Sequence, residues 1–364
     1  MSTNHLYHTL FERVRQLWPK VRVTQQRNLV WLMVGICQSQ SVHLSKIAMK
    51  IPGAAKLVSI ERRLERFLSH TQLSAFEWYK PLARHWLKAA SQTTGEIRLI
   101  IDGTKVGFGF QLVVIALAFR RRAIPLAWLW LRYRKGHSSA QHQIALVQRV
   151  RRLLPTKARV TLVGDTEFES GALQHELIEW GWQYALRQKP NNLFQLTGTT
   201  LWQAFETLVT QPGQRRWLDQ VQVTAKHTLT TNIFAYWKSG ELGPWLLATN
   251  FPSFSHTWRA YSRRMWIEEM FGDLKRHGFD LESTHLRHVY RLSRLTLAVF
   301  LLYDWLLLLG ARTIKAGLRS LVDRKDRRDL CLFQIGLRLL ERRLINLKTC
   351  RVVFFPNSPK LSGS

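Results

Sequence analysis

The stretch EIRLIIDGTKVGFGFQLVVIALAFRRRAIPLAWLWLR, residues 96–132, decides the fold class. It holds three runs rich in β-branched and aromatic residues, separated by Gly107 and Gly109 and then by three consecutive arginines. Runs of this kind with turn residues between them are typical of strands joined by tight connections. The pattern therefore predicts an antiparallel β-meander.

Helices and strands alternate after the meander. We predict a helix over 139–154, a strand over 159–165 (RVTLVGD), a helix over 170–180 and a strand over 182–188 (WQYALRQ). Three strands, a helix, a strand, a helix and a strand is the order of the ribonuclease H-like fold, a mixed sheet flanked by helices. The predicted fold class is therefore α/β, with a ribonuclease H-like mixed sheet.

The charge balance indicates a polyanion as partner. The 364 residues include 54 Lys and Arg against 24 Asp and Glu, which leaves a formal net charge of +30. Each DNA phosphate that a basic side chain neutralises releases counterions, and this sequence-independent gain supplies much of the affinity of DNA-binding proteins. Double-stranded DNA is therefore the expected partner. A merely basic protein or a membrane-surface binder is the alternative.

Two short helices near the N-terminus, joined by the Pro52-Gly53 turn, resemble a helix-turn-helix. In the second, SIERRLERFL, three arginines lie off the apolar face: Arg62, Arg63 and Arg66. They could contact phosphates or base edges of DNA. They could equally form an ordinary solvated helix face.

The cysteines, the N-terminal residues and the most apolar run together predict the cellular compartment. Its three cysteines are far apart, which indicates neither a disulfide framework nor a zinc knuckle, and residues 1–18 lack the apolar core of a signal peptide. The most apolar run, 295–309, contains Asp304 and is shorter than the ~20 residues needed to cross a bilayer. We expect a buried core helix there, no membrane partner, and a cytoplasmic, nucleoid-associated protein.

Two acidic residues follow apolar strands. Asp102 ends the run IRLIID, and Asp165 closes VTLVGD and precedes a helix. Carboxylates at the ends of two strands could converge on one hard cation, and Mg²⁺ favours carboxylate oxygens and water in near-octahedral geometry. The alternative is that each acid only caps a turn or forms a salt bridge.

A third acid lies on a helix predicted from about Trp258 to Lys275. At about 100° per residue, four side chains share an arc of about 60°: Tyr261, Arg264, Glu268 and Lys275. An apolar set occupies the other side: Trp266, Ile267, Met270, Phe271 and Leu274. Glu269 points sideways from the shared arc. The spacing therefore favours Glu268 over Glu269 as the third acid.

The spacing of Tyr261, Arg264, Glu268 and Lys275 is similar to the Tyr-Arg-Glu-Lys signature of DDE transposases from bacterial insertion sequences. The likeness is greatest to the cut-and-paste subgroup that forms hairpin intermediates. Further matching runs lie between residue 61 and about 275: ERRLERFL, IDGTK, LVGDTEF, PWLLATN and YSRRMWIEEMFGDLK. The chain departs from the family at Glu167, where a small residue is common, so Glu167 could support or replace a metal ligand.

The resemblance implies a DNA transposase. Such an enzyme binds the ends of an insertion sequence, cleaves them by metal-dependent phosphodiester hydrolysis through a hairpin intermediate, and joins the 3′-hydroxyl ends to target DNA. By the same resemblance, Asp102, Asp165 and Glu268 would be catalytic and would hold two Mg²⁺ ions, for which Mn²⁺ could substitute. Arg264 and Lys275 match positions that contact DNA near the cleaved phosphate.

The resemblance assigns two aromatic residues as well. Tyr261 would hydrogen-bond the region of the terminal phosphate. Trp245 stands where the subgroup carries an aromatic residue on which an extruded base stacks, although it could instead be a core tryptophan at the start of a strand. Cleavage of two ends in one complex also implies a homodimer on DNA.

Composition and motifs divide the chain into four parts. Residues 1–92 form a predicted helical DNA-binding domain, and 93–290 a ribonuclease H-like catalytic domain with a β-strand insertion at about 190–242. Residues 291–355 form a basic helical region, and the tail 356–364 is expected to be disordered. N-terminal and C-terminal helical regions therefore flank the predicted sheet.

Two other functions remain open from the sequence. One is a catalytically silent DNA-binding regulator derived from a transposase, and the other is a structure-selective nuclease without strand transfer. The pairs His137/His142 and His285/His288 lack a third ligand nearby, so we predict no zinc site. No Walker-type phosphate loop occurs, so ATP is not implied.

Overall fold

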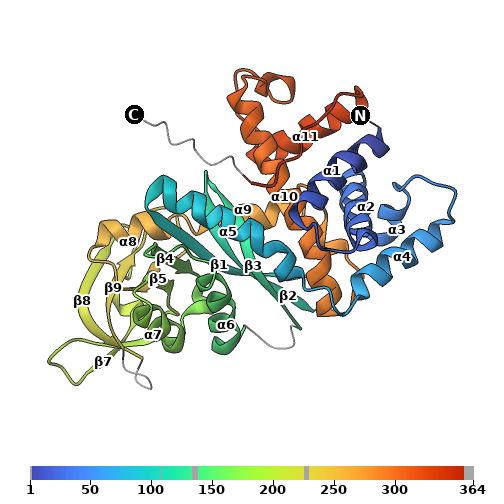
Figure 1. The fold of residues 1–364 in the computed structure, drawn as a ribbon. Helices are drawn as coiled ribbons and strands as arrows, with labels where there is room; N and C mark the ends of the chain where they lie inside the picture. The colour runs from blue at the N-terminus through green and yellow to red at the C-terminus, as the bar shows by residue number, and fades with distance from the viewer. Residues whose placement is uncertain (1, 108, 133–137, 225–228, 356–364) are drawn as a thin grey trace. The chain divides into compact units, whose positions relative to one another are not determined.

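The structure is a computed structural model that describes residues 2–107, 109–132, 138–224 and 229–355. It divides into two compact units, and Figure 1 traces the chain by residue number. The first unit comprises Met1–Ala89, Lys105–Gln111 and Met270–Ser364, and the second comprises Ala90–Thr104 and Leu112–Glu269. The first is helical, and the second contains most of the β-structure.

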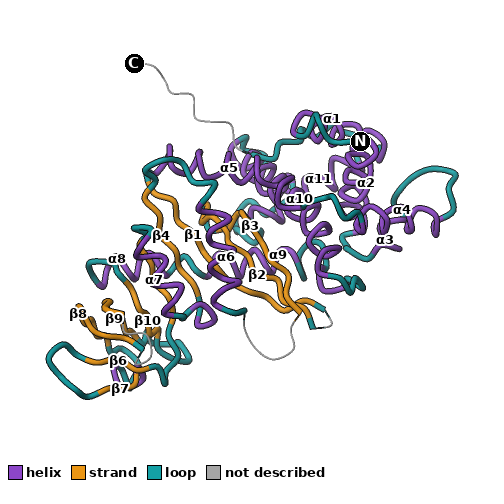
Figure 2. Tube along the Cα trace, turned by 60° about the horizontal axis from the view of Figure 1, so that its bottom comes forward, coloured by secondary structure: helices purple, strands orange, loops and turns teal. Residues whose placement is uncertain are grey.

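The β-strands of the described residues form one ten-stranded sheet in the order β3-β2-β1-β4-β5-β10-β9-β8-β6-β7. Figure 2 draws the strands in orange. The first five strands of the sheet in chain order are β1 (Glu96–Val106), β2 (Phe110–Phe119), β3 (Arg122–Arg132), β4 (Arg159–Gly164) and β5 (Gln183–Arg187). β1 pairs with β4, and β4 with β5, in parallel. The neighbours β1, β2 and β3 are joined by only a few residues, which permits antiparallel pairing alone.

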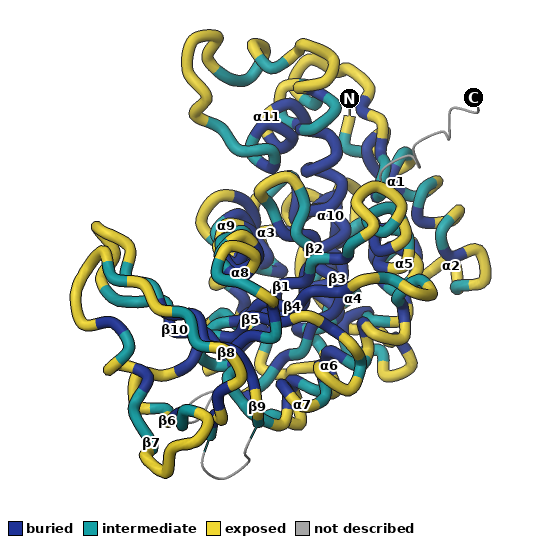
Figure 3. Tube along the Cα trace, turned by 90° about the vertical axis from the view of Figure 1, so that its left-hand side faces the viewer, coloured by how far each residue is buried: buried dark blue, intermediate teal, exposed yellow. Residues whose placement is uncertain are grey.

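Helices of the second unit cover both faces of this sheet. α6 (Ala140–Arg151) packs against β3 and α7 (Gly171–Glu179), and α7 packs against β5. α8 (Phe254–Tyr261) packs against β4 and β5, and Figure 3 shows it on the other side of the sheet from α6 and α7. The predicted fold class, an α/β mixed sheet with flanking helices, is confirmed.

The segment between β5 and the return strand extends the same sheet. Its strands are β6 (Leu193–Gln195), β7 (Trp202–Ala204), β8 (Arg215–Val223) and β9 (Leu229–Tyr236), followed by β10 (Trp245–Thr249). β10 pairs antiparallel with both β5 and β9, so it joins the inserted strands to the central ones. Buried apolar residues such as Phe194, Phe205 and Ile233 give the insertion its own core.

The helices of the first unit include α1 (Thr3–Leu17), α2 (Val23–Ser39), α3 (Leu44–Ala48), α4 (Leu57–Ser69), α5 (Ala75–Thr94), α10 (Val289–Lys315) and α11 (Leu332–Ile345). The apolar run at 295–309 lies in α10, which is 27 residues long and therefore longer than expected. Its length and composition would suit a membrane span, but 94% of its most apolar window is buried within the protein (Figure 3). Asp304 is buried there, and its carboxylate accepts a hydrogen bond of 2.6 Å from the Tyr79 hydroxyl.

The backbones of α10 and α11 touch where two glycines face each other. A Cβ atom on Gly336 would overlap the carbonyl oxygen of Leu306, and one on Gly310 would overlap that of Leu332. Cores are close-packed, so neither helix has room to yield locally. The crossing of these helices therefore requires glycine at both positions.

We predict that Gly336→Ala lowers the free energy of unfolding by about 1–3 kcal/mol, because the added methyl group forces the two helices apart. Urea unfolding measures the effect. Gly272→Ala is the matched control, since a Cβ there would meet His277 at an ordinary contact of 3.7 Å. Equal stability of the two variants would contradict the prediction.

Candidate active site

The register of β1 against β4 brings Asp102 and Asp165 together. The parallel pairing runs from Glu96 opposite Arg159 to Ile101 opposite Gly164, so the two aspartates are the next residues in register. The prediction that Asp102 ends its strand is wrong in one detail, because β1 continues to Val106 after the pairing with β4 has stopped. The carboxylates nevertheless come from the same level of adjacent strands.

Local hydrogen bonds and close packing hold both aspartates. Asp102 accepts the backbone N–H of Gly103 at 2.7 Å, and Asp165 accepts that of Thr166 at 2.8 Å. A Cβ atom on Gly164 would lie 2.9 Å from the Ile101 side chain and 3.0 Å from that of Leu186. Glycine is therefore required just before Asp165, where β4 passes between its two neighbours.

The helix predicted from 258 to 275 is in fact two helices. α8 ends at Tyr261 and α9 (Met265–Leu274) begins after a turn at residues 262–264. The shared arc of four residues therefore does not exist: Tyr261 and Arg264 are buried, whereas Glu268 is exposed. The apolar side is largely as predicted, with Ile267, Met270, Phe271 and Leu274 buried and Trp266 half-buried.

One guanidinium contacts all three acids. Arg264 Nη1 lies 3.1 Å from Asp102 Oδ2 and 3.8 Å from Asp165 Oδ2, and Nη2 lies 2.6 Å from Glu268 Oε1. The Arg264 side chain is only 8% exposed. Three carboxylates that would otherwise repel one another are therefore gathered around a single buried positive charge.

The electrostatics of Asp102 follow from its burial. Desolvation raises the pKa of its carboxyl to about 7, although the positive charge of Arg264 and the N–H of Gly103 favour the ionised form. The negative charges of Asp165 and Glu268 add to the rise. A further positive charge at this point would therefore favour the ionised carboxylate.

The adjacent acids Glu268 and Glu269 have different partners. Glu268 belongs to the group around Arg264, whereas Glu269 Oε2 lies 3.4 Å from Arg122 Nη1. The carboxylate of Glu167 accepts the backbone N–H of Ser138 at 2.8 Å and also its hydroxyl, just before α6. Glu268 is therefore the glutamate that the structure brings to the two aspartates.

Arg187 is a site residue that the sequence reasoning missed. β4 and β5 pair as far as Gly164 opposite Leu186, so Arg187 is next in register to Asp165. Its Nη1 lies 4.0 Å from Asp165 Oδ1, and its Nη2 donates to the carbonyl of Pro244 at 3.1 Å. Its position just after the apolar residues of its strand, like that of Asp165, was the available signal.

Tyr261 and Trp245 lie beside each other in an aromatic cluster. Their rings are edge to face with centroids 5.0 Å apart, and Trp245 stacks on Trp258 at 4.9 Å. The Tyr261 hydroxyl is buried and has no hydrogen-bond partner among the described residues. Trp245 is half-buried at the start of β10, which is compatible with either interpretation of this residue.

The other predicted DNA contacts belong to the first unit. The Lys275 ammonium donates to the carbonyl of Lys105 at 2.6 Å and lies 2.8 Å from a Glu282 oxygen. On α4, Arg62 and Arg66 are exposed and Arg63 is half-buried. α4 packs against the short helix α3, as a two-helix motif requires.

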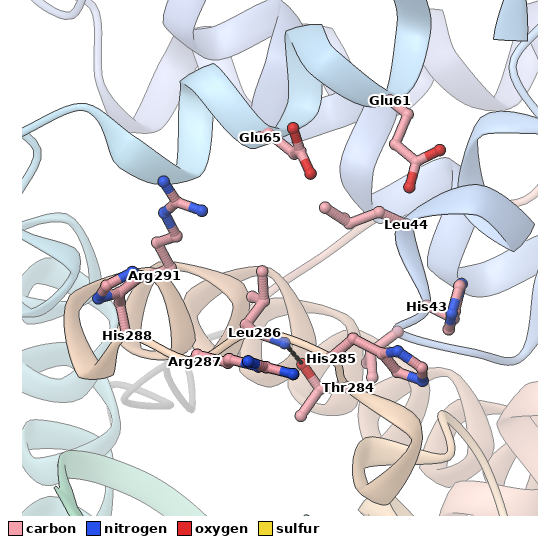
Figure 4. Close-up of a pocket in the computed structure, with 11 residues that line it drawn as sticks. His43, Leu44, Glu61, Glu65, Thr284, His285, Leu286, Arg287, His288 and Arg291 are labelled. Carbon is pink, nitrogen blue, oxygen red and sulfur yellow. Dashed lines mark hydrogen bonds between the residues drawn. The ribbon is translucent and has the colours of Figure 1, made fainter. Parts of the chain in front are cut away.

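No three His, Cys, Asp or Glu groups among the described residues are arranged to hold a metal ion. His285 and His288 line a pocket of about 250 Å³ into which Glu61 and Glu65 project from α4 (Figure 4). His137 lies outside the described residues. The three acids around Arg264 therefore pair with its guanidinium and are not arranged as a metal site in this structure.

Comparison with known proteins identifies the family. Residues 94–305 match the model of the transposase DDE domain, and this region contains all three acids. The chain belongs to the DDE transposase family. A DDE transposase acts on DNA and uses divalent metal ions, so the carboxylate donors of this transposase are chemically suited to its cofactor.

No curated protein sequence matches the transposase. Among solved structures, one similar chain comes from "Cryo-EM structure of piggyBac transposase synaptic complex with hairpin DNA". It is 7% identical, with a TM-score of 0.41, and the alignment covers 99% of this chain and 84% of that chain.

We predict that Arg264→Gln destabilises the metal-free transposase by roughly 3 kcal/mol at pH 8, because the buried Asp102 carboxylate loses its counter-charge. Chemical unfolding in the presence of a chelator measures the effect. Adding Asp102→Asn to Arg264→Gln should recover part of the loss, since the unpaired charge is then removed. A double variant no more stable than Arg264→Gln would refute the assigned cause.

Proposed function

We propose that this chain is an active transposase that cleaves the ends of a bacterial insertion sequence and joins them to target DNA. The observation that carries the proposal is the convergence of Asp102, Asp165 and Glu268 on Arg264, within 4 Å of its guanidinium nitrogens. Three carboxylates of one family signature at one point are the donor set that such chemistry needs. Glu268 is exposed, so a DNA phosphate could reach it.

The three carboxylates would hold two Mg²⁺ ions, with Mn²⁺ as a substitute. When bound, a pair of such ions activates the attacking oxygen and stabilises the leaving oxygen of an in-line displacement. Arg264 occupies the space between the acids in their present arrangement. It therefore competes with a divalent cation for the same oxygens, and it must turn away before they can act as ligands.

Arg264 then has a second role. A guanidinium presents a planar fork that binds phosphate through two hydrogen bonds. Once released from the carboxylates, Arg264 is beside the place where the scissile phosphate must lie. Arg187, on the other side of Asp165, would contribute a second positive charge to the same phosphate region.

The aromatic residues suit a hairpin intermediate. The buried, unpartnered hydroxyl of Tyr261 would hydrogen-bond the terminal phosphate region. Trp245, half-buried next to Tyr261, would stack on a base extruded in the tight DNA turn. Lys275 and the arginines of α4, Arg62, Arg63 and Arg66, would contact the DNA backbone.

The remaining features of the proposal follow from this chemistry. Two element ends must be cut in one complex, so we propose a homodimer assembled on DNA. Its substrate places it with the nucleoid in the cytoplasm. A catalytically silent regulator is the second candidate, because the acids as they stand do not form a ready metal site among the described residues. Cleavage of end-bearing DNA by the wild-type protein would exclude that candidate.

We predict that Asp102→Asn, Asp165→Asn and Glu268→Gln each reduce cleavage of element-end DNA in Mg²⁺ by roughly 100-fold or more, because each removes a metal ligand. Binding of the same DNA, followed by mobility shift, should persist. Glu269→Gln is the matched control. Glu269 pairs with Arg122 and not with Arg264, so this variant is expected to cleave the DNA as well as the wild type. Near-normal cleavage by all three variants would rule out this active site.

We further predict that Arg264→Gln binds Mn²⁺ about tenfold more tightly than the wild type, a gain of about 1.4 kcal/mol, because the competing cation is gone. Isothermal titration calorimetry without DNA measures this directly. Arg263→Gln is the control, because Arg263 is adjacent in sequence and lies near Glu96 and Arg98 instead. Unchanged or weaker Mn²⁺ binding by Arg264→Gln would show that the arginine does not occupy the metal position.

A further inference from the structure

Two arginines of the first unit line one pocket, Arg13 on α1 and Arg351 beyond α11. Arg312, in the last turn of α10, is near enough to be affected by their charges. The half-buried Arg312 has a lowered pKa, first because of its burial and then because of the positive charges of Arg351 and Arg13. Within the described part of the chain, no ion pair joins any of them to an acid. This arginine cluster is therefore uncompensated.

A pocket opens at two members of the arginine cluster. Its volume is about 250 Å³, and its walls are Arg13, Gln16 and Leu17 of α1 together with Arg351 and residues 353–355. Arg13 Nη1 donates to Gln16 Oε1 at 2.7 Å, which orients the guanidinium. Charged groups beside apolar walls are poorly screened, so an anion in this pocket would be attracted strongly.

The fold itself sets the position of Arg351. Cys350, Val352 and Phe354 are buried, so the alternating Arg351 side chain is turned outward. The indole N–H of Trp305 on α10 donates to the carbonyl of Arg351 at 3.2 Å. This hydrogen bond ties the segment that carries Arg351 to α10.

Like charges held together oppose folding unless an anion offsets them. Arginine is the side chain best matched to phosphate, because its fork donates two parallel hydrogen bonds. The chain has a net charge of +30, and its family acts on DNA. Of the available anions, a phosphate of the DNA backbone is the one that this enzyme meets in its function.

We propose that Arg13 and Arg351 form a binding site for a backbone phosphate of duplex DNA, on elements that carry none of the three acids. The proposal rests on the proposed function, since it assumes that the chain binds DNA. A phosphate carries no base identity, so the site adds affinity and positions the duplex without reading its sequence.

The test compares two double variants of the full-length protein that lose the same charge. Arg13→Gln with Arg351→Gln removes two members of the cluster, and Arg15→Gln with Lys348→Gln removes two exposed cations from the same segments. Binding to a labelled duplex of arbitrary sequence is followed by fluorescence anisotropy over a salt series. We expect the first variant to bind the duplex about tenfold more weakly than the second. The slope of its log binding constant against log salt concentration should be smaller in magnitude by about 1 for each phosphate that it no longer neutralises.

Thermal unfolding provides the control for folding and for a free anion. Loss of mutual repulsion should leave the melting temperature of Arg13→Gln/Arg351→Gln unchanged or higher than that of the control variant at low salt. Equal DNA affinity and salt slope for the two variants would overturn the proposal. A second result would also overturn it: inorganic phosphate stabilises the wild type but not Arg13→Gln/Arg351→Gln, while the two double variants bind DNA with equal affinity. The site would then hold a free anion.

These outcomes are separable from failure of the proposed function. If the wild type binds the duplex and the two variants behave alike, only the arginine site is refuted. If the wild type binds no duplex DNA at all, the proposed transposase activity fails as well. Cleavage by the wild type with no difference between the variants would leave the active site intact and remove this site alone.

Discussion

The parallel pairing of β1, β4 and β5 is the constraint on which the candidate site depends. Its register places Asp102, Asp165 and Arg187 in consecutive positions across three strands, just beyond the last paired residues. Gly164 lets the strands approach at this level, because a side chain there would press on both neighbours. A shift of one residue would turn these side chains to the opposite face and separate them.

Arg264 connects this sheet edge to the third acid. The sheet alone would bring two carboxylates together in a buried place, where they repel each other and lose hydration. The turn between α8 and α9 delivers a guanidinium to that point, and the first turn of α9 then adds Glu268. In the structure Arg264 thus pairs with all three acids, and under the proposed function divalent cations would take its place.

The insertion and the return strand β10 place aromatic side chains at the same end of the strands as the acids. β10 lies against β5, and its first residue, Trp245, packs beside Tyr261 at the end of α8. An aromatic surface is thereby built next to the acids by segments that are distant in sequence. The first unit contributes a different kind of surface, basic and helical: Arg62 and Arg66 of α4 are exposed, and Arg13 and Arg351 line a pocket.

Much of the fold was predictable because its signals are local. Strand and helix periodicity, the turns and the order of elements were enough for the α/β class, and Asp102 and Asp165 could be selected because each follows an apolar run. Glu268 was selected from a helical arc that the structure does not contain, although its carboxylate does lie beside Arg264. The helix break at 262–264 was not predictable, because an apolar and charged pattern that suits one helix also suits two.

Only the tertiary structure decided which side chains meet. Burial of Arg264 among three acids, the place of Arg187 beside Asp165, and the pocket that Arg13 and Arg351 share all depend on strand register and on helices that approach from distant parts of the chain. Side-chain periodicity describes one element at a time, whereas these contacts arise from packing between elements. The sequence by itself therefore determined the elements and the chemistry available on them, and the packing determined where that chemistry is concentrated.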